Sequence, residues 1–98
     1  MKIPKTIIIG PHTYRITFEK GLDYNHNALG QSRHTKGEII LEPEQSPTQL
    51  EESFIHEVLH CIDSQVKFAS TNKSVAEDSI RRLSPMFLQV LKENKLLK

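Results

Sequence analysis

The chain has 98 residues, of which 37% are hydrophobic and 26% charged, and its formal net charge is +1 at neutral pH. These values predict one soluble globular domain over residues 1–98 with a modest core. The sequence has no basic tail or dense lysine and arginine block, so nothing in it points to nucleic acid. No apolar run is long enough to cross a membrane. The single cysteine, Cys61, cannot form an intrachain disulfide, which favours the cytoplasm.

The N-terminal part has the pattern of a β-hairpin. Residues 6–9 are β-branched and lead into a Gly-Pro turn, which is typical of a short strand and its end. Residues 12–18 then alternate, and the apolar side of this second strand is formed by Tyr14, Ile16 and Phe18. We expect the two strands to pair as a hairpin, with Tyr14 in the core.

Two further short strands are predicted after a loop. Residues 20–31 are rich in glycine and asparagine and are expected to form the loop. Residues 32–35 can form a third strand, Lys36-Gly37 reads as a turn, and Glu38 to Leu41 gives a fourth strand. The N-terminal half is therefore expected to be a small antiparallel sheet of three or four strands.

The following segment carries strong signals for a helix. Ser46 can cap its start together with Gln49, and Pro47 falls at the first helical position, where its missing N–H does no harm. Apolar residues then recur every fourth position, as expected for a helix packed on the sheet. They are Leu50, Phe54, Val58, Ile62 and Val66. The helix should extend to about Lys67.

A second helix is predicted near the C-terminus, which makes the fold α+β, with the sheet packed on two C-terminal helices. Ser74 and Glu77 have the spacing of a capping box, and apolar residues follow at helical intervals. Pro85 interrupts this pattern, so we expect a kink or two short helices in succession.

The first helix contains the pattern His-Glu-x-x-His at residues 56–60. Residues four apart lie on the same face of a helix, so His56 and His60 can bind one metal ion, for which zinc is the usual choice. Glu57 is turned about 100° from His56 and lies beside the ion. A carboxylate there can act as a general base toward a metal-held water.

A catalytic zinc site needs a third protein ligand. No histidine follows His60, so a carboxylate on the second helix is the expected solution, with Glu77 favoured over Asp78. The competing interpretation makes Glu77 only a cap for the backbone N–H of Ser74. If the helix begins before Ser74, Glu77 lies inside the helix and this capping role no longer applies.

Other polar residues have less specific interpretations. Cys61 is expected to be a small buried residue rather than a zinc ligand. Asp63 shares a helix face with His56 and could accept the free N–H of a ligand histidine, or could simply be exposed. His26 and His34 are expected on the surface and not on a metal.

The chain resembles the gluzincins, in which a downstream helical glutamate completes the His-Glu-x-x-His site. More narrowly, it is similar to small phage and prophage proteins related to the ImmA/IrrE-type metallopeptidases. The residues that carry the resemblance are Tyr14, Gly37 to Leu41, Phe54 to Asp63, and Glu77 to Leu83. The resemblance implies a zincin-like fold, a protein substrate and, if the chain is phage-encoded, a location in the host cytoplasm.

The predicted function is zinc-dependent peptide hydrolysis with Glu57 as the general base. The substrate is expected to lie along an exposed strand edge, for which residues 38–41 are the candidate. Arg81 and Arg82 are possible stabilisers of the oxyanion. One alternative is a metal-binding phage accessory module without proteolytic activity. Another is an interaction protein that binds no metal.

Overall fold

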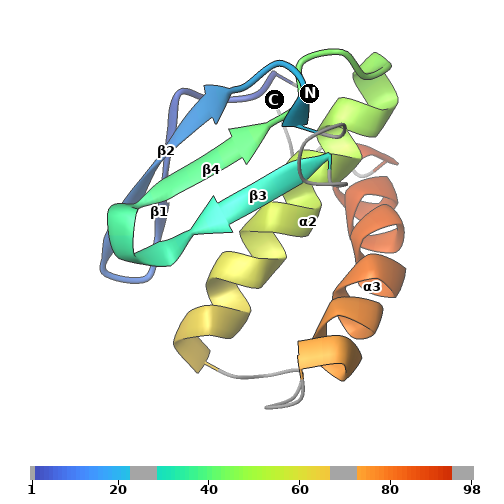
Figure 1. Cartoon of the computed structure of the whole chain (residues 1–98). Helices are drawn as coiled ribbons and strands as arrows, with labels where there is room; N and C mark the ends of the chain where they lie inside the picture. Colours follow the sequence, from blue (N-terminus) through green and yellow to red (C-terminus); the bar gives the residue numbers. More distant parts are fainter. Residues whose placement is uncertain (1, 23–28, 67–72, 94–98) are drawn as a thin grey trace.

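The computed structural model describes residues 2–22, 29–66 and 73–93. Within them, a four-stranded sheet is followed by two long helices (Figure 1). The elements are β1 (Thr6–Ile9), β2 (His12–Phe18), β3 (Gly30–Arg33), the short 3-10 helix η1 (His34–Lys36), β4 (Glu38–Leu41), α2 (Pro47–Val66) and α3 (Lys73–Glu93). This arrangement confirms the predicted α+β class.

The sheet is mixed, with strand order β1-β2-β4-β3. The pairs β1–β2 and β3–β4 are antiparallel, but β2 and β4 run parallel, with Ile16 opposite Ile39. The prediction of a wholly antiparallel sheet is therefore wrong for this central pair. The chain first forms β3 on the far side and then returns through η1, so that β4 enters beside β2 in the same direction. A parallel pair requires such a long connection.

The position of β4 also corrects the expected substrate edge. Residues Glu38–Leu41 lie between β2 and β3, so both sides of this strand are already paired. Among the described strands, the outer ones are β1 and β3. Residues 38–41 are therefore not an outer edge beside which an extended peptide could pair.

A glycine makes the return from η1 into β4 possible. Gly37 has a φ of 62°, in the left-handed region that disfavours other residues. A Cβ atom there would lie 2.9 Å from the carbonyl oxygen of Thr13. The third strand was predicted to include residues 34 and 35. It is shorter at this end, because His34 already belongs to η1.

Helix α2 begins as predicted. The backbone N–H of Gln49 donates to Ser46 Oγ at 3.2 Å, and Pro47 is the first helical residue. The side-chain nitrogen of Gln49 donates to Ser53 Oγ at 3.4 Å, further along the helix. The helix extends to Val66, and the predicted end at Lys67 lies outside the described residues.

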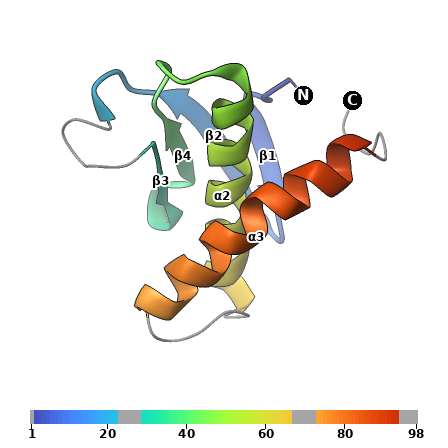
Figure 2. The same ribbon diagram turned by 90° about the vertical axis from the view of Figure 1, so that its right-hand side faces the viewer.

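Helix α2 forms a layer between the sheet and α3, as both views show (Figures 1 and 2). The core lies mainly where α2 meets the sheet and α3. Its buried members are Ile9, Tyr14, Ile16, Ile39, Leu41, Phe54, Ile55, Val58, Leu59, Cys61, Ile80 and Leu88. Tyr14 is in the core as expected, whereas Phe18, the last residue of β2, is 52% exposed. The predicted alternation thus holds only for the first part of that strand.

Helix α3 is continuous through Pro85, so the alternative of two short helices is wrong, while the expected kink at Pro85 stays a prediction. A proline inside a helix removes one backbone hydrogen bond, and its ring crowds the carbonyl group four residues back, so the helix around it must be supported by other contacts. Here Ser84, just before the proline, is buried and its hydroxyl donates to the Ile80 carbonyl at 2.7 Å. Of the helices in the described ranges, none is long and apolar enough to cross a membrane.

Candidate metal centre

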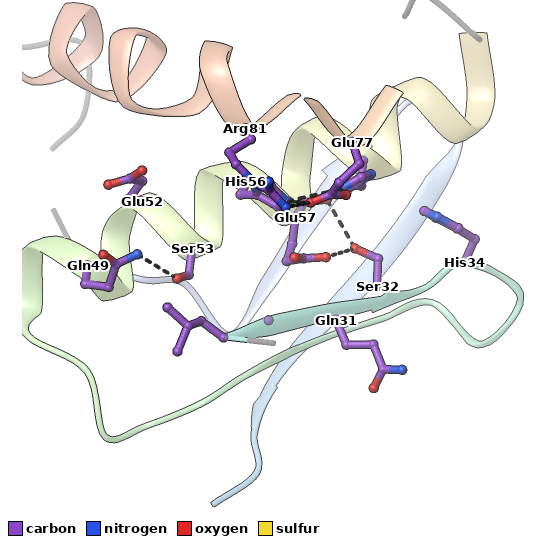
Figure 3. A pocket seen from close by; sticks show the side chains of 13 residues that line it. Gln31, Ser32, His34, Gln49, Glu52, Ser53, His56, Glu57, Glu77 and Arg81 are labelled. Atoms are coloured by element: carbon purple, nitrogen blue, oxygen red, sulfur yellow. Dashed lines mark hydrogen bonds and ion pairs between the residues drawn. The ribbon is translucent and has the colours of Figure 1, made fainter. Parts of the chain in front are cut away.

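Three side chains from the two helices converge on one point (Figure 3). His56 Nε2 lies 3.1 Å from Glu77 Oε1, and His60 Nε2 lies 2.6 Å from Glu77 Oε2. The two histidine Nε2 atoms are 3.1 Å apart. One ligand atom from each residue therefore lies within 4.8 Å of the others. The described residues form one such group of potential metal ligands.

The local structure explains this convergence. His56 and His60 are one turn apart on α2, so their rings lie side by side with centroids 4.8 Å apart. Helix α3 already begins at Lys73, so Glu77 lies inside the helix. Glu77 therefore does not have the position required to cap a helix that starts at Ser74. Because α3 packs across α2, Glu77 reaches both imidazoles.

Asp78 does not take part in this group. Its side chain is 57% exposed and pairs with Arg82 at 3.2 Å, one turn further along α3. The structure therefore brings together His56, His60 and Glu77, the predicted set, and turns Asp78 and Arg82 away from it.

The donor atoms fit a divalent metal ion. Four tetrahedral ligands held about 2.0–2.1 Å from one ion lie roughly 3.3 Å from each other. The two 3.1 Å separations are close to this value, and the 2.6 Å contact requires a small outward movement of the Glu77 carboxylate. Two imidazoles and one carboxylate form a donor set that suits zinc and leaves one ligand position for another molecule.

The charge on Glu77 is stabilised within the group. Burial alone would raise its pKa, but the electrostatic interactions with His60 and His56 and the hydrogen bond with His60 outweigh burial and lower the pKa. Arg81 contributes in the same direction, with its guanidinium 3.5 Å from Glu77 Oε1. Glu77 is thus ionised at neutral pH, as a metal ligand must be.

Glu57 lies beside the group but is not a member of it. Its side chain is only 6% exposed, and burial raises the pKa of its carboxyl group. The Ser32 hydroxyl of β3 donates to Glu57 Oε1 at 2.5 Å, which opposes that rise because it favours the charged form. A carboxylate with a raised pKa is a stronger base than an exposed one, which suits proton transfer.

These groups line a cavity of about 800 Å³ between β3, α2 and the first half of α3 (Figure 3). Gly30, Ser32 and His34 border it on the sheet side. Among the described residues that line it, Arg81 alone carries a guanidinium or ammonium group, and its side chain is 70% exposed.

The other residues considered in the sequence analysis are not metal ligands in the structure, as far as it describes them. Cys61 is fully buried and is not part of the ligand group, as expected. Asp63 is buried, which contradicts an exposed position, while its hydrogen bond to a ligand histidine stays a prediction. His34 is exposed in η1 and not in a strand, with its ring edge-on to Tyr14. His26 lies outside the described residues.

Sequence reasoning missed the role of β3 beside Glu57. Gly30 stands in the stretch predicted to be a loop and Ser32 at the start of the predicted third strand, and no motif marks either residue. The one signal was their spacing: Gly30 and Ser32 are two positions apart, so they lie on the same face of a strand. Only the strand order reveals that this face meets α2.

Comparisons with protein-family models, with curated proteins and with solved structures found no match.

Proposed function

We propose that this chain is a zinc-dependent metallopeptidase in which Glu57 acts as the general base. The observation that carries the proposal is the convergence of His56, His60 and Glu77 beside the buried carboxylate of Glu57. Three protein ligands leave a position open at a tetrahedral ion, which is the arrangement of catalytic rather than structural zinc.

Each residue has a distinct role in this proposal. His56, His60 and Glu77 would hold the zinc ion, which when bound lowers the pKa of water and polarises a carbonyl group. Glu57 accepts a proton from the attacking water and passes it to the amine that leaves. Burial supports this role because it raises the pKa of Glu57.

The proposed substrate is a protein or peptide segment in extended conformation. Strand β3 borders the cavity and is an outer strand of the described sheet, so a peptide can pair with it by β-augmentation. Arg81, at the opposite wall, is the candidate to stabilise the negative charge that develops on the scissile carbonyl oxygen. A chain whose single cysteine is buried and unpaired suits the reducing cytoplasm.

The deciding experiment separates metal binding from chemistry. Glu57→Gln keeps the size of the side chain but cannot accept a proton at neutral pH. We expect the variant to bind the same amount of zinc as the wild type. We also expect it to cleave an unfolded protein substrate such as casein about 10²–10⁴-fold more slowly.

Two outcomes would overturn the proposed mechanism. Undiminished cleavage by Glu57→Gln would exclude Glu57 as the base. Zinc bound fully by both proteins, without cleavage of casein or of host-lysate proteins by either, would favour the alternative of a metal-binding module without proteolytic activity.

A further inference from the structure

The side chain of Glu57 is enclosed by β3 as well as by its own helix. The Ser32 hydroxyl contacts Glu57 twice, at 2.5 Å from Oε1 and at 3.3 Å from the backbone carbonyl oxygen. Figure 3 shows Ser32 pointing from β3 toward Glu57, while Gln31 points to the other side of the strand. A short hydrogen bond to an ionised carboxylate is among the stronger ones in proteins.

Gly30 leaves the space in which the side chain of Glu57 lies. A Cβ atom at residue 30 would be 2.9 Å from Glu57 Cγ and 3.1 Å from Oε2. Gly30 is not among the glycines with positive φ, so the backbone itself accepts alanine. The steric conflict therefore concerns the side chain of Glu57 and not the conformation of the strand.

Ser32 also lies close to buried side chains. Cys61 is fully buried on α2, and its thiol interacts with the hydroxyl groups of Ser32 and Tyr14. Tyr14 also interacts with Gln65, whose side-chain nitrogen donates to the Ile9 carbonyl at 2.9 Å. Ser32 therefore lies close to buried side chains of the core as well as to Glu57.

We propose that Ser32 and Gly30 are positioning residues for Glu57. The Ser32 hydroxyl anchors one carboxylate oxygen, and the missing side chain at Gly30 lets the carboxylate lie against β3, beside the three metal ligands and not among them. A general base must be held within a fraction of an ångström of its productive place, and a misplacement of about 1 Å can cost about 10²-fold in rate. The catalytic part of this inference rests on the proposed peptidase function, whereas the positioning part does not.

The first test needs no activity and uses the metal-free protein. Gly30→Ala is introduced into the wild type and into Glu57→Ala, which lacks the Cγ atom that the new methyl group would meet. We expect Gly30→Ala to lower the thermal midpoint of the wild type by roughly 4–8 °C, the effect of a moderate clash in a chain of this size. In the Glu57→Ala background the same change should have little effect. An equal loss in both backgrounds, or none in either, would overturn the role of Gly30.

The second test uses the zinc-loaded enzyme with casein as substrate. We expect Ser32→Ala to lower kcat at least about tenfold, with KM and zinc content unchanged, and Ser32→Thr to restore most of the rate because it keeps the hydroxyl. Ser84→Ala is the matched control, since it removes a buried hydroxyl that donates to the Ile80 carbonyl of its own helix. A kcat of Ser32→Ala equal to that of the wild type, or a loss that follows zinc content, would contradict the proposal.

A wild type that cleaves nothing would refute the proposed function without deciding on the position of Glu57. The matching test of Ser32 is then a double-variant cycle in the metal-free protein, with thermal unfolding of Ser32→Ala, Glu57→Ala and the double variant. We expect the double variant to lose less than the sum of the single losses. Additive losses would overturn the anchoring role of Ser32.

Discussion

His60 on α2 and Glu77 on α3 meet at 2.6 Å between Nε2 and Oε2. This contact, with its counterpart between His56 and Glu77 at 3.1 Å, links the two helices at the cavity. The three side chains are linked to one another by hydrogen bonds. Both histidine side chains are partly exposed, at 20% for His56 and 24% for His60, so an ion from solvent has access to them.

The first prediction concerns zinc stoichiometry. Protein purified without a histidine tag should contain about one zinc ion per chain, and His56→Ala or His60→Ala should abolish binding because each removes a direct ligand. Elemental analysis after gel filtration measures the content. His12→Ala, an exposed histidine on β2, is the matched control and should keep its zinc. Unchanged zinc content in both ligand variants would refute the metal site.

The second prediction distinguishes the two adjacent acids on α3. Loss of a group that only supports a metal ligand costs about 10–100-fold in affinity, so loss of a direct ligand in Glu77→Ala should cost at least about 100-fold. Asp78→Ala should leave the affinity within about threefold of the wild type, since an exposed ion pair such as Asp78–Arg82 contributes little. Competition with a chromophoric zinc chelator gives both constants. A larger effect of Asp78→Ala would show that Asp78, and not Glu77, faces His56 and His60 on α2.

The third prediction links zinc to the stability of the fold. Because the ligands come from two helices, the native state binds zinc far better than the unfolded chain. Zinc at 100 times its dissociation constant should therefore stabilise the protein by about 2.7 kcal/mol. Thermal unfolding with zinc and with EDTA measures the difference. His60→Ala should show no such difference, and an equal shift in that variant would point to binding elsewhere.

The helices were predictable from the sequence because their signals are local. Ser46 and Pro47 mark the start of α2, and the four-residue apolar period identifies its buried face. The spacing of His56 and His60 then determines their common direction without knowledge of the rest of the fold. The choice of Glu77 depended on the need for a third ligand and on the resemblance, and the local question of whether α3 begins before Ser74 decided only the competing role as a cap.

The arrangement of the sheet could not be obtained in the same way. Strand order depends on contacts between segments far apart in the chain, so nothing near Glu38–Leu41 reveals that β3 covers its outer side. For the same reason, Ser32 and Gly30 gave no sign of their contacts with Glu57, which come from pairing with β4 and packing on α2.

The last prediction concerns Cys61, which directly follows the proposed ligand His60 and could be considered as a fourth ligand. The structure places it on another face of α2, fully buried and in contact with Ser32 and Tyr14. Burial is the main cause that raises the pKa of its thiol to about 11, so the thiol is protonated and shielded at neutral pH. We therefore expect almost no reaction with a thiol reagent at pH 8 in the folded protein and complete reaction in guanidinium chloride.

Cys61→Ala should keep about one zinc ion per chain and lose roughly 1 kcal/mol of stability through the lost packing. Zinc loss in a folded Cys61→Ala protein would make Cys61 a ligand, close the fourth position and turn the centre into a structural site.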